Sequence, residues 1–397
     1  MSDMSSIHNL GVPIAVDVSK IEIELSKLWQ TASPTEESNA VLRACSCNLV
    51  VIAEGRAEAA ALLEVLAGVA EHHPSRSIIA FGEPSGEPPR DAPSAPMKAW
   101  ISAQCSLPYP GRPQVCSEVI TLAARENAMA DLPNTVSSLL VPDLPVFVYW
   151  RSFKDRQQSM VENMVKFAHL LIVDSHASKD DPHSRERLLQ LLNRRPGGIA
   201  VRDLNWARLT AWRDLISQFF DHPSLRLLAY QISEVEINRD IEYPGNVPTR
   251  TLLLTGWLAT QLNWRRVTAE RRGGEWISRW LSPSGEVLVR FSGQQAQSGQ
   301  PRGISSIELH TRNGGVLKAA RSRGSDCITA TASAEGITLS HVAPQDTPEE
   351  AILLTRELSL PGEDSSFQVA LAEAIALEKS FTETVARVNT LWPKIFR

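Results

Sequence analysis

The fold is decided by residues 41–81, which read VLRACSCNLVVIAEGRAEAAALLEVLAGVAEHHPSRSIIAF. Residues 41–53 predict a β-strand centred on the apolar run 48–52, and the alanine- and leucine-rich residues 56–71 predict a helix. Residues 76–81 predict a second strand. A strand, a helix and a strand within about 40 residues form a βαβ unit with a right-handed crossover. The sequence therefore predicts an α/β domain built on a mostly buried sheet.

Neighbouring segments extend this α/β domain to residues 41–176. Residues 97–105, 115–124 and 167–174 predict further strands, and residues 126–140 predict a helix that is interrupted near Pro133. Residues 144–150 form a nearly continuous apolar run, which is typical of a strand buried on both faces. Residues 1–40 are expected to form an N-terminal segment with one helix after Asp17.

A polar, turn-rich stretch at 174–184 predicts a domain boundary, followed by an α+β domain over 184–397. It begins with helices at 185–193 and 203–221, a strand at 225–238 and a helix at 250–262. The region of about 266–345 is β-rich, and two helices, at 347–357 and 366–388, close the chain. The short segments of the β-rich region predict an antiparallel meander. They are 267–270, 276–281, 287–292, 304–311, 316–320, 327–332 and 338–341.

Length and composition indicate a two-domain globular protein. A chain of 397 residues exceeds one ordinary core, and 43% hydrophobic with 21% charged residues argues against global disorder. A net charge of −5 offers no electrostatic reason to expect a nucleic-acid partner. No apolar run reaches the roughly 18–20 residues of a membrane helix. No signal peptide is visible, so we expect a cytoplasmic protein without membrane contact.

The sequence lacks the short motifs that are typical of nucleotide-binding, metalloprotease and serine hydrolase sites. It contains no GxGxxG, no GxxxxGK[ST] and no HExxH. Residues 82–86, GEPSG, resemble GxSxG only superficially, because Pro84 precedes the serine and the context is a proline-rich loop. The sequence therefore offers no candidate catalytic residues and no candidate cofactor or metal site.

The five cysteines are odd in number and scattered, which argues against a disulfide framework. Cys45 and Cys47 lie two apart in the predicted strand, so both side chains should point to one face. Three interpretations stay open for this pair: small half-buried strand residues, which we favour, a redox switch, or metal ligands.

Residues 203–221, DLNWARLTAWRDLISQFFD, contain a strongly amphipathic helix. The apolar positions 212, 215, 216, 219 and 220 form one helical face, which favours a core position for Trp212. Thr210 is a candidate N-cap. Trp206, Arg208 and Arg213 lie either at the edge of the core or against a ligand or partner, since Trp and Arg dominate interface energetics. The candidate contact residues are Trp206, Arg208, Thr210 and Arg213.

Asp174 and Ser175 follow an apolar strand, and the carboxyl ends of strands in α/β sheets are common ligand sites. The simpler interpretation is a strand-end turn in which both side chains bond to nearby backbone. We keep both residues as contact candidates.

Several segments together resemble the OpcA family of glucose-6-phosphate dehydrogenase assembly proteins. The specific one is 203–213, with the pattern Asp-Leu-x-Trp-x-Arg-Leu-Thr-x-Trp-Arg, and the others are 73–79, 140–146 with Trp150, 172–175 and 256–259. The resemblance covers roughly 41–265. It implies a non-enzymatic protein that binds glucose-6-phosphate dehydrogenase, promotes its active oligomer and activates it allosterically in the oxidative pentose phosphate pathway. In photosynthetic relatives this control is linked to cysteine redox state.

A second hypothesis rests on the residues alone. Arg208, Arg213 and the strand end at Asp174 and Ser175 would suit an enzyme or sensor that binds a phosphorylated metabolite, because arginine forks recognise phosphate.

Overall fold

The protein is described by a computed structural model and divides into two compact units. The described residues are 11–32, 41–83, 95–106, 114–151, 157–176, 182–194, 199–241, 247–272, 275–295, 303–321, 327–334, 336–344, 349–360 and 362–391. The N-terminal unit comprises Met1–Ser178, Asn193–Leu204 and Glu349–Glu363, and the C-terminal unit comprises Lys179–Leu192, Asn205–Pro348 and Asp364–Arg397. Residues 193–204 and 349–363 thus lie in the N-terminal unit, although the polar stretch at 174–184 predicted that they belong to the second domain.

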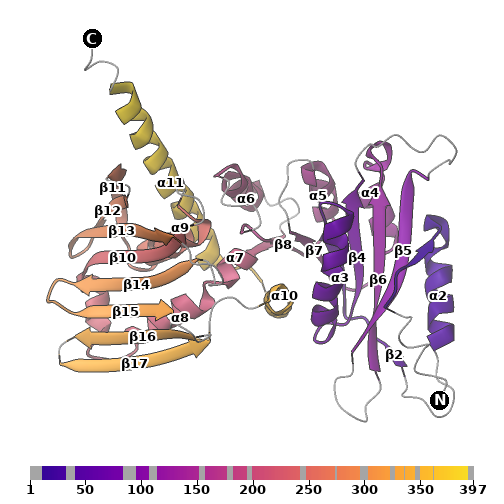
Figure 1. Ribbon diagram of the computed structural model, residues 1–397, viewed down its shortest axis with the longest axis horizontal. Helices are drawn as coiled ribbons and strands as arrows, with labels where there is room; N and C mark the ends of the chain where they lie inside the picture. Colours follow the sequence, from indigo (N-terminus) through magenta and orange to yellow (C-terminus); the bar gives the residue numbers. More distant parts are fainter. Residues whose placement is uncertain are drawn as a thin grey trace. The chain divides into compact units, whose positions relative to one another are not determined.

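A nine-stranded sheet forms the centre of the N-terminal unit (Figure 1). Its strands are β1 (Ile14–Val16), β2 (Val41–Arg43), β3 (Cys47–Ile52), β4 (Ser75–Gly82), β5 (Met97–Ser106), β6 (Gln114–Ala124), β7 (Val146–Trp150), β8 (Leu170–Val173) and β9 (Ala200–Asp203). The order is β1-β5-β6-β4-β3-β7-β8-β9, with β2 paired to β6. All neighbours from β6 to β9 are parallel, whereas β5 and β1 add an antiparallel edge.

The helices of this unit are α2 (Ile21–Ala32), α3 (Arg56–Ala70), α4 (Leu132–Ser138), α5 (Gln158–Val165) and α10 (Glu350–Ser359), with 3-10 turns at Val18–Lys20 and Glu126–Ala128. The β3–α3–β4 segment is the predicted βαβ unit, and β3 and β4 are buried along their whole length. The predicted helix at 126–140 is a 3-10 turn followed by α4, because Pro133 begins a new helix more readily than it continues one.

The single strand predicted at 41–53 is two strands in the structure. β2 pairs with β6, whereas β3 pairs with β4 and β7. Residues 44–46 therefore carry the chain from a position beside β6 to a position between β4 and β7. Cys45 therefore precedes β3, and the expectation that it shares a strand face with Cys47 was wrong.

The C-terminal unit contains an eight-stranded sheet (Figure 1). Its strands are β10 (Ile232–Ile241), β11 (Arg265–Arg272), β12 (Glu275–Ser282), β13 (Gly285–Gln295), β14 (Ile304–Thr311), β15 (Val316–Arg321), β16 (Cys327–Ala334) and β17 (Ile337–Pro344), in the order β11-β12-β13-β10-β14-β15-β16-β17. The predicted antiparallel meander is confirmed only in part, because β10 enters the sheet parallel to β13 and separates β13 from β14. The strand predicted at 225–238 begins only at Ile232, after a 3-10 turn at Arg226–Gln231.

Helices α8 (Thr210–Phe219), α9 (Thr249–Gln261) and α11 (Ser365–Leu391) belong to this unit. The unit boundaries fall within α6 (Pro182–Arg194) and after the first residue of α7 (Leu204–Ala207). α9 is almost entirely buried and packs along α11. The close approach depends on Gly256, since a Cβ atom there would lie 2.3 Å from the carbonyl oxygen of Ala370. Among the described residues, no helix combines the length and the apolar character needed to cross a bilayer.

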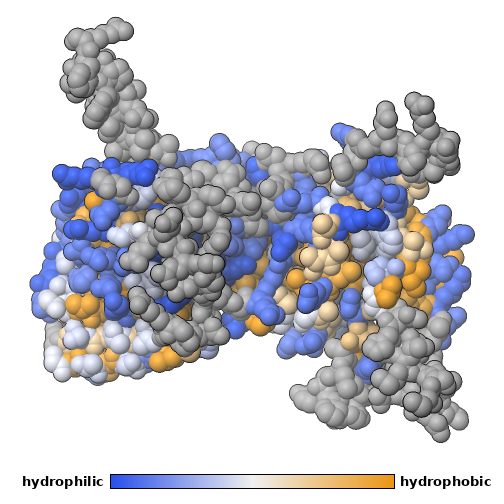
Figure 2. Space-filling view, in the orientation of Figure 1, coloured by the Kyte–Doolittle hydropathy of each residue, from blue (hydrophilic) through white to orange (hydrophobic). Residues whose placement is uncertain are grey.

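In β12, β14 and β16 buried residues alternate with more accessible ones, so one face of these strands is buried, and the accessible side of the sheet carries polar side chains together with apolar ones such as Leu281 and Val342. In β12 the buried positions alternate strictly with more exposed ones. On the view of Figure 2, hydrophilic and weakly polar residues intermingle with hydrophobic ones over this unit. Such mixing is ordinary for a protein surface.

Candidate functional site

Trp206 lies in α7 and forms the centre of a cluster with Asp364, Phe367 and Arg213. Its indole Nε1 donates a 2.7 Å hydrogen bond to Asp364 Oδ2, and its ring centroid is 5.7 Å from that of Phe367. The guanidinium carbon of Arg213 lies 3.7 Å from the indole centroid, in cation–π geometry. With 4% of its surface exposed, Trp206 is a buried residue at the edge of the core.

Asp364 connects this cluster to the start of α11. While Oδ2 accepts the indole N–H, Oδ1 accepts the backbone N–H of Phe367 at 2.9 Å. The second contact is an N-cap, because it satisfies an amide that the first turn of a helix leaves unpaired. One carboxylate therefore begins α11 and anchors α7 to it.

The remaining candidates, on α8 and in the short link that precedes it, are more accessible. Thr210 is exposed, Arg208 and Arg213 are half-buried, and Arg213 Nη2 donates to Thr210 Oγ1 at 3.1 Å. Thr210 is the first residue of α8 and Leu209 is the N-cap, so the predicted N-cap role of Thr210 was wrong. Trp212 is fully buried, as the helical pattern predicted. Contact of Arg208, Thr210 and Arg213 with a partner stays a prediction.

Asp174 and Ser175 lie at the carboxyl end of β8, beside the end of β9. The Ser175 backbone N–H and hydroxyl donate to the two carboxylate oxygens of Asp203, at 3.0 and 2.6 Å. Asp174 Oδ1 accepts the backbone N–H of His176 at 3.0 Å. The side chains of Asp174, Ser175 and Asp203 are all buried. The Asp174 bond is the local turn chemistry that the simpler interpretation predicts, whereas the Ser175 hydroxyl bonds to the distant side chain of Asp203 and not to nearby backbone. A ligand role for Asp174 and Ser175 stays a prediction.

Arg202, next to Asp203, holds the end of α10. Its Nη1 donates to the carbonyl oxygen of Glu357 at 3.1 Å, and its Nη2 donates to those of Leu360 and Gly362 at 3.1 and 2.6 Å. A buried cation near a helix C-terminus satisfies carbonyls that the helix leaves unpaired. Sequence reasoning missed this role, since Arg202 and α10 are more than 150 residues apart.

A second ion-pair group lies where β3 and β7 end. Arg151 Nη1 is 2.7 Å from Glu58 Oε1, and Arg151 Nε and Nη2 each lie 2.8 Å from a carboxylate oxygen of Glu350. Tyr149 Oη donates to Glu350 Oε1 at 2.8 Å. Burial lowers the pKa of Arg151, but the hydrogen bonds to Glu350 and Glu58 outweigh it and raise the pKa overall. Burial, with the nearby charges of Asp174 and Glu350, raises the pKa of Tyr149 well above its usual value.

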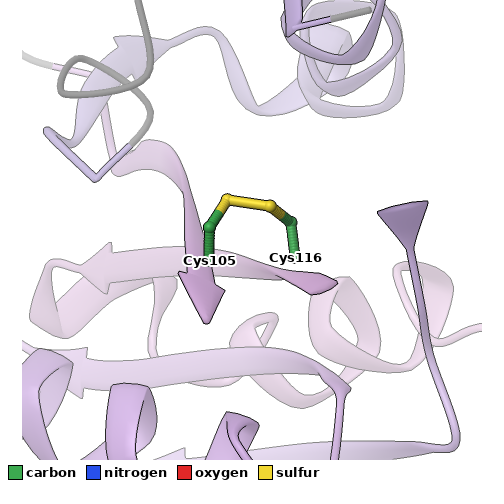
Figure 3. The surroundings of a disulfide bond; sticks show 2 residues. All are labelled: Cys105 and Cys116. Atoms are coloured by element: carbon green, nitrogen blue, oxygen red, sulfur yellow. A yellow bond between two sulfur atoms is a disulfide. The ribbon is translucent and has the colours of Figure 1, made fainter. Parts of the chain in front are cut away.

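The structure corrects the expectation that the cysteines form no disulfide. Cys105 in β5 and Cys116 in β6 are bonded, with their Cα atoms 4.0 Å apart (Figure 3). The two residues face each other directly in the antiparallel register of these strands. That register, rather than the spacing in the sequence, brings them together.

Cys45 and Cys47 are free thiols, half-buried and buried respectively. Burial raises the pKa of Cys45, and it raises the pKa of Cys47 to about 11. A raised pKa leaves less of the nucleophilic thiolate at neutral pH. A redox role for the pair stays a prediction.

Three residues on the accessible face of the C-terminal sheet have the chemistry and spacing of metal ligands. Ligand atoms of Glu236, Glu308 and His310 all lie within 4.8 Å of one another. However, the ammonium of Lys318 is 2.6 Å from Glu308 Oε1. Glu308 therefore forms a cross-strand ion pair with Lys318, which lies opposite it in β15.

Comparison with known families assigns the chain. Residues 67–190 match the family model described as "Glucose-6-phosphate dehydrogenase subunit N-terminal domain", and residues 199–371 match the corresponding C-terminal domain. The chain belongs to the OpcA family of glucose-6-phosphate dehydrogenase assembly proteins.

Curated relatives agree with this assignment. A protein of Nostoc punctiforme named "Putative OxPP cycle protein OpcA" is 27% identical over 282 residues, which cover 67% of this chain and 56% of the relative. A Synechocystis protein of the same name is 25% identical over 292 residues, which cover 71% of this chain and 60% of the relative. The chain thus matches less than two thirds of the length of either relative.

Among solved structures, an NAD binding oxidoreductase from Klebsiella pneumoniae is similar with a TM-score of 0.47 and 10% identity, covering 86% of this chain and 98% of that one. Myo-inositol dehydrogenase from Lactobacillus casei has a TM-score of 0.42 and 9% identity, covering 86% of this chain and 94% of that one. Such values say nothing about the chemistry of this chain.

Proposed function

We propose that this chain is a non-catalytic partner of glucose-6-phosphate dehydrogenase that acts in the cytoplasm, supports the active oligomer of the enzyme and activates it allosterically. The observation that carries the proposal is the match of two family models, both described as domains of a glucose-6-phosphate dehydrogenase subunit, to successive parts of the chain. The name of the relatives, which refers to the OxPP cycle, supports a place in the oxidative pentose phosphate pathway.

The candidate site residues suit a binding role. Ser175 is bonded to Asp203, and Arg202 to the end of α10, so these buried polar groups stabilise the fold. Arg213, half-buried on α8, covers the buried indole of Trp206 in α7 and donates to the exposed hydroxyl of Thr210, so Arg213 and Thr210 are the accessible part of this cluster. Arginine is enriched among the residues that carry most of the binding energy of interfaces.

Activation follows if the chain prefers one oligomer of the enzyme. A protein that binds the active oligomer more tightly than the inactive one shifts the population toward it by the difference in binding free energy. A coupling of about 1–3 kcal/mol corresponds to a 5–150-fold change in affinity. Because linkage is reciprocal, ligands that favour the active oligomer should also tighten the binding of this chain.

The test is a titration of the purified dehydrogenase of the same cell with this chain while glucose-6-phosphate oxidation is followed. We expect a saturable rise in rate or a saturable fall in KM. Arg208→Ala and Arg213→Ala should raise the concentration of this chain that gives half-saturation. Lys27→Ala, which removes an exposed cation from α2, should leave it unchanged. The absence of any change in rate or KM at every ratio would contradict activation.

A further inference from the structure

The parallel part of the N-terminal sheet has the strand order of dinucleotide-binding domains. Its six strands follow one another along the chain as β3, β4, β6, β7, β8 and β9, and their order in space is β6-β4-β3-β7-β8-β9. Counted along the chain, this order is 3-2-1-4-5-6. In sheets of this order the ligand binds outside the carboxyl ends of the strands, where the first and fourth strands lie side by side. In this protein that switch point lies between β3 and β7.

A dinucleotide places its pyrophosphate on the free amides at the start of the helix after the first strand. Here that helix is α3. Its N-cap is Gly55, which has no side chain that could bond to the first amides of the helix. Glu58, in the first turn, turns its carboxylate back so that Oε2 accepts the backbone N–H of Glu54 at 2.5 Å. The amide that Glu58 binds belongs to Glu54, in the turn between β3 and the N-cap, so a carboxylate of the chain itself occupies the turn that leads into α3.

Arg151 holds this carboxylate from the other side of the switch point. It follows β7 directly, donates to Glu58 through Nη1, and forms a bidentate pair with Glu350 through Nε and Nη2. Glu58 and Glu350 are each only 16% exposed at the side chain. Bidentate arginine–carboxylate pairs with little exposure are among the stronger ion pairs in proteins.

Glu350 belongs to the first turn of α10, and α10 packs directly on α3. The Cβ atom of Ala351 lies 2.8 Å from the position that a Cβ atom would take at Gly68 in α3. The three charged residues, which we call the Glu58–Arg151–Glu350 clamp, therefore join β7, α3 and α10 within the N-terminal unit.

We infer that the switch point of this sheet is not a dinucleotide site: the Glu58 carboxylate takes the place of the ligand phosphate, and Arg151 uses its fork to fasten α10. A pyrophosphate placed here would meet the negative charges of Glu58 and Glu350 at close range. At the ribose position the chain does carry an acidic residue, Glu83 after β4, whose carboxylate is paired with Lys98 at 3.0 Å, so the misfit lies at the pyrophosphate position. The residues present do not fit a dinucleotide, and this inference goes beyond the proposed partnership with the dehydrogenase.

The experiment uses the full chain alone, so its outcome is independent of the dehydrogenase. Wild type, Glu58→Ala, Glu350→Gln and Gly55→Ala are titrated with NADH and NADPH and followed by cofactor fluorescence, and their melting temperatures are measured with and without inorganic pyrophosphate. Gly55→Ala is the matched control, because its backbone is extended and a Cβ atom there meets nothing within 4 Å.

We expect no saturable binding of NADH or NADPH to wild type up to about 1 mM, the range of very weak ligands. Glu58→Ala and Glu350→Gln should melt at least about 2 °C below wild type and Gly55→Ala. Pyrophosphate should raise the melting temperature of Glu58→Ala more than that of wild type, because it replaces the lost anion. Saturable binding of either nucleotide to wild type would overturn the inference, as would wild-type melting of both clamp variants or the absence of rescue by pyrophosphate.

Discussion

Removing the carboxylate of Asp364 should cost more stability than removing either contact it makes. Its bond to Trp206 Nε1 has a charged acceptor, and such bonds contribute about 1.5–3 kcal/mol. Its bond to the Phe367 amide is an N-cap, which contributes about 1 kcal/mol. We therefore expect Asp364→Ala to lower the free energy of unfolding of the C-terminal unit by roughly 2.5–4 kcal/mol.

Asp364→Asn separates the two contributions. Asparagine is as good an N-cap as aspartate, so this variant should keep the cap through its carbonyl oxygen. Its Nδ2 group is a donor and cannot accept the indole N–H, so the bond to Trp206 is lost. We expect a loss of roughly 1.5–3 kcal/mol, smaller than that of Asp364→Ala. In a Trp206→Phe background Asp364→Asn should cost little, since the indole donor is then absent.

Urea unfolding followed by circular dichroism measures these differences, with the transition of the C-terminal unit fitted by itself because a two-unit chain need not unfold in one step. Equal stability of Asp364→Ala and Asp364→Asn would refute the cap. Zero coupling between positions 206 and 364 in the double-mutant cycle would refute the indole bond.

Three further predictions concern other parts of the fold. Gly256→Ala should destabilise the chain by about 1–3 kcal/mol in thermal unfolding, because its Cβ atom would meet the Ala370 carbonyl oxygen 2.3 Å away; a neutral effect would contradict the close packing of α9 on α11. Reducing the Cys105–Cys116 disulfide, whose cysteines are 11 positions apart, should lower the free energy of unfolding by about 3 kcal/mol, whereas reductant should not destabilise Cys116→Ser further. Identical melting of oxidised and reduced wild type would count against the bond. Burial raises the pKa of Cys47 from 9.0 to about 11, so its neutral thiol stabilises the fold below pH 9, and this contribution is lost as the pH rises to 11. Wild type should therefore lose about 2–3 kcal/mol of stability over this pH range that Cys47→Ala does not lose, and parallel pH profiles of the two proteins would contradict this.

Local patterns in the sequence were enough to predict part of this structure. The β3–α3–β4 unit and the burial of Trp212 follow from apolar periodicity within one segment, and both are confirmed. Pairing between distant segments was not accessible. The parallel insertion of β10 beside β13 breaks an antiparallel order that turn signals alone would suggest.

The same contrast between local and long-range contacts holds for the candidate sites. The turn bonds of Asp174 are local, and the simpler interpretation anticipated them. Asp364 caps α11 and bonds to an indole 158 positions away, and Glu350 reaches Arg151 across 199 positions. Such contacts depend on which elements pack together, and no periodicity within one segment carries that information.

The central claim is that this chain binds glucose-6-phosphate dehydrogenase and favours its active oligomer. Sedimentation velocity of the dehydrogenase with and without this chain, at one fixed enzyme concentration, tests it most directly. The account predicts that the chain co-sediments with the enzyme and shifts the enzyme into the larger, active species. Independent sedimentation of the two proteins, with the oligomer distribution of the enzyme unchanged, would contradict it.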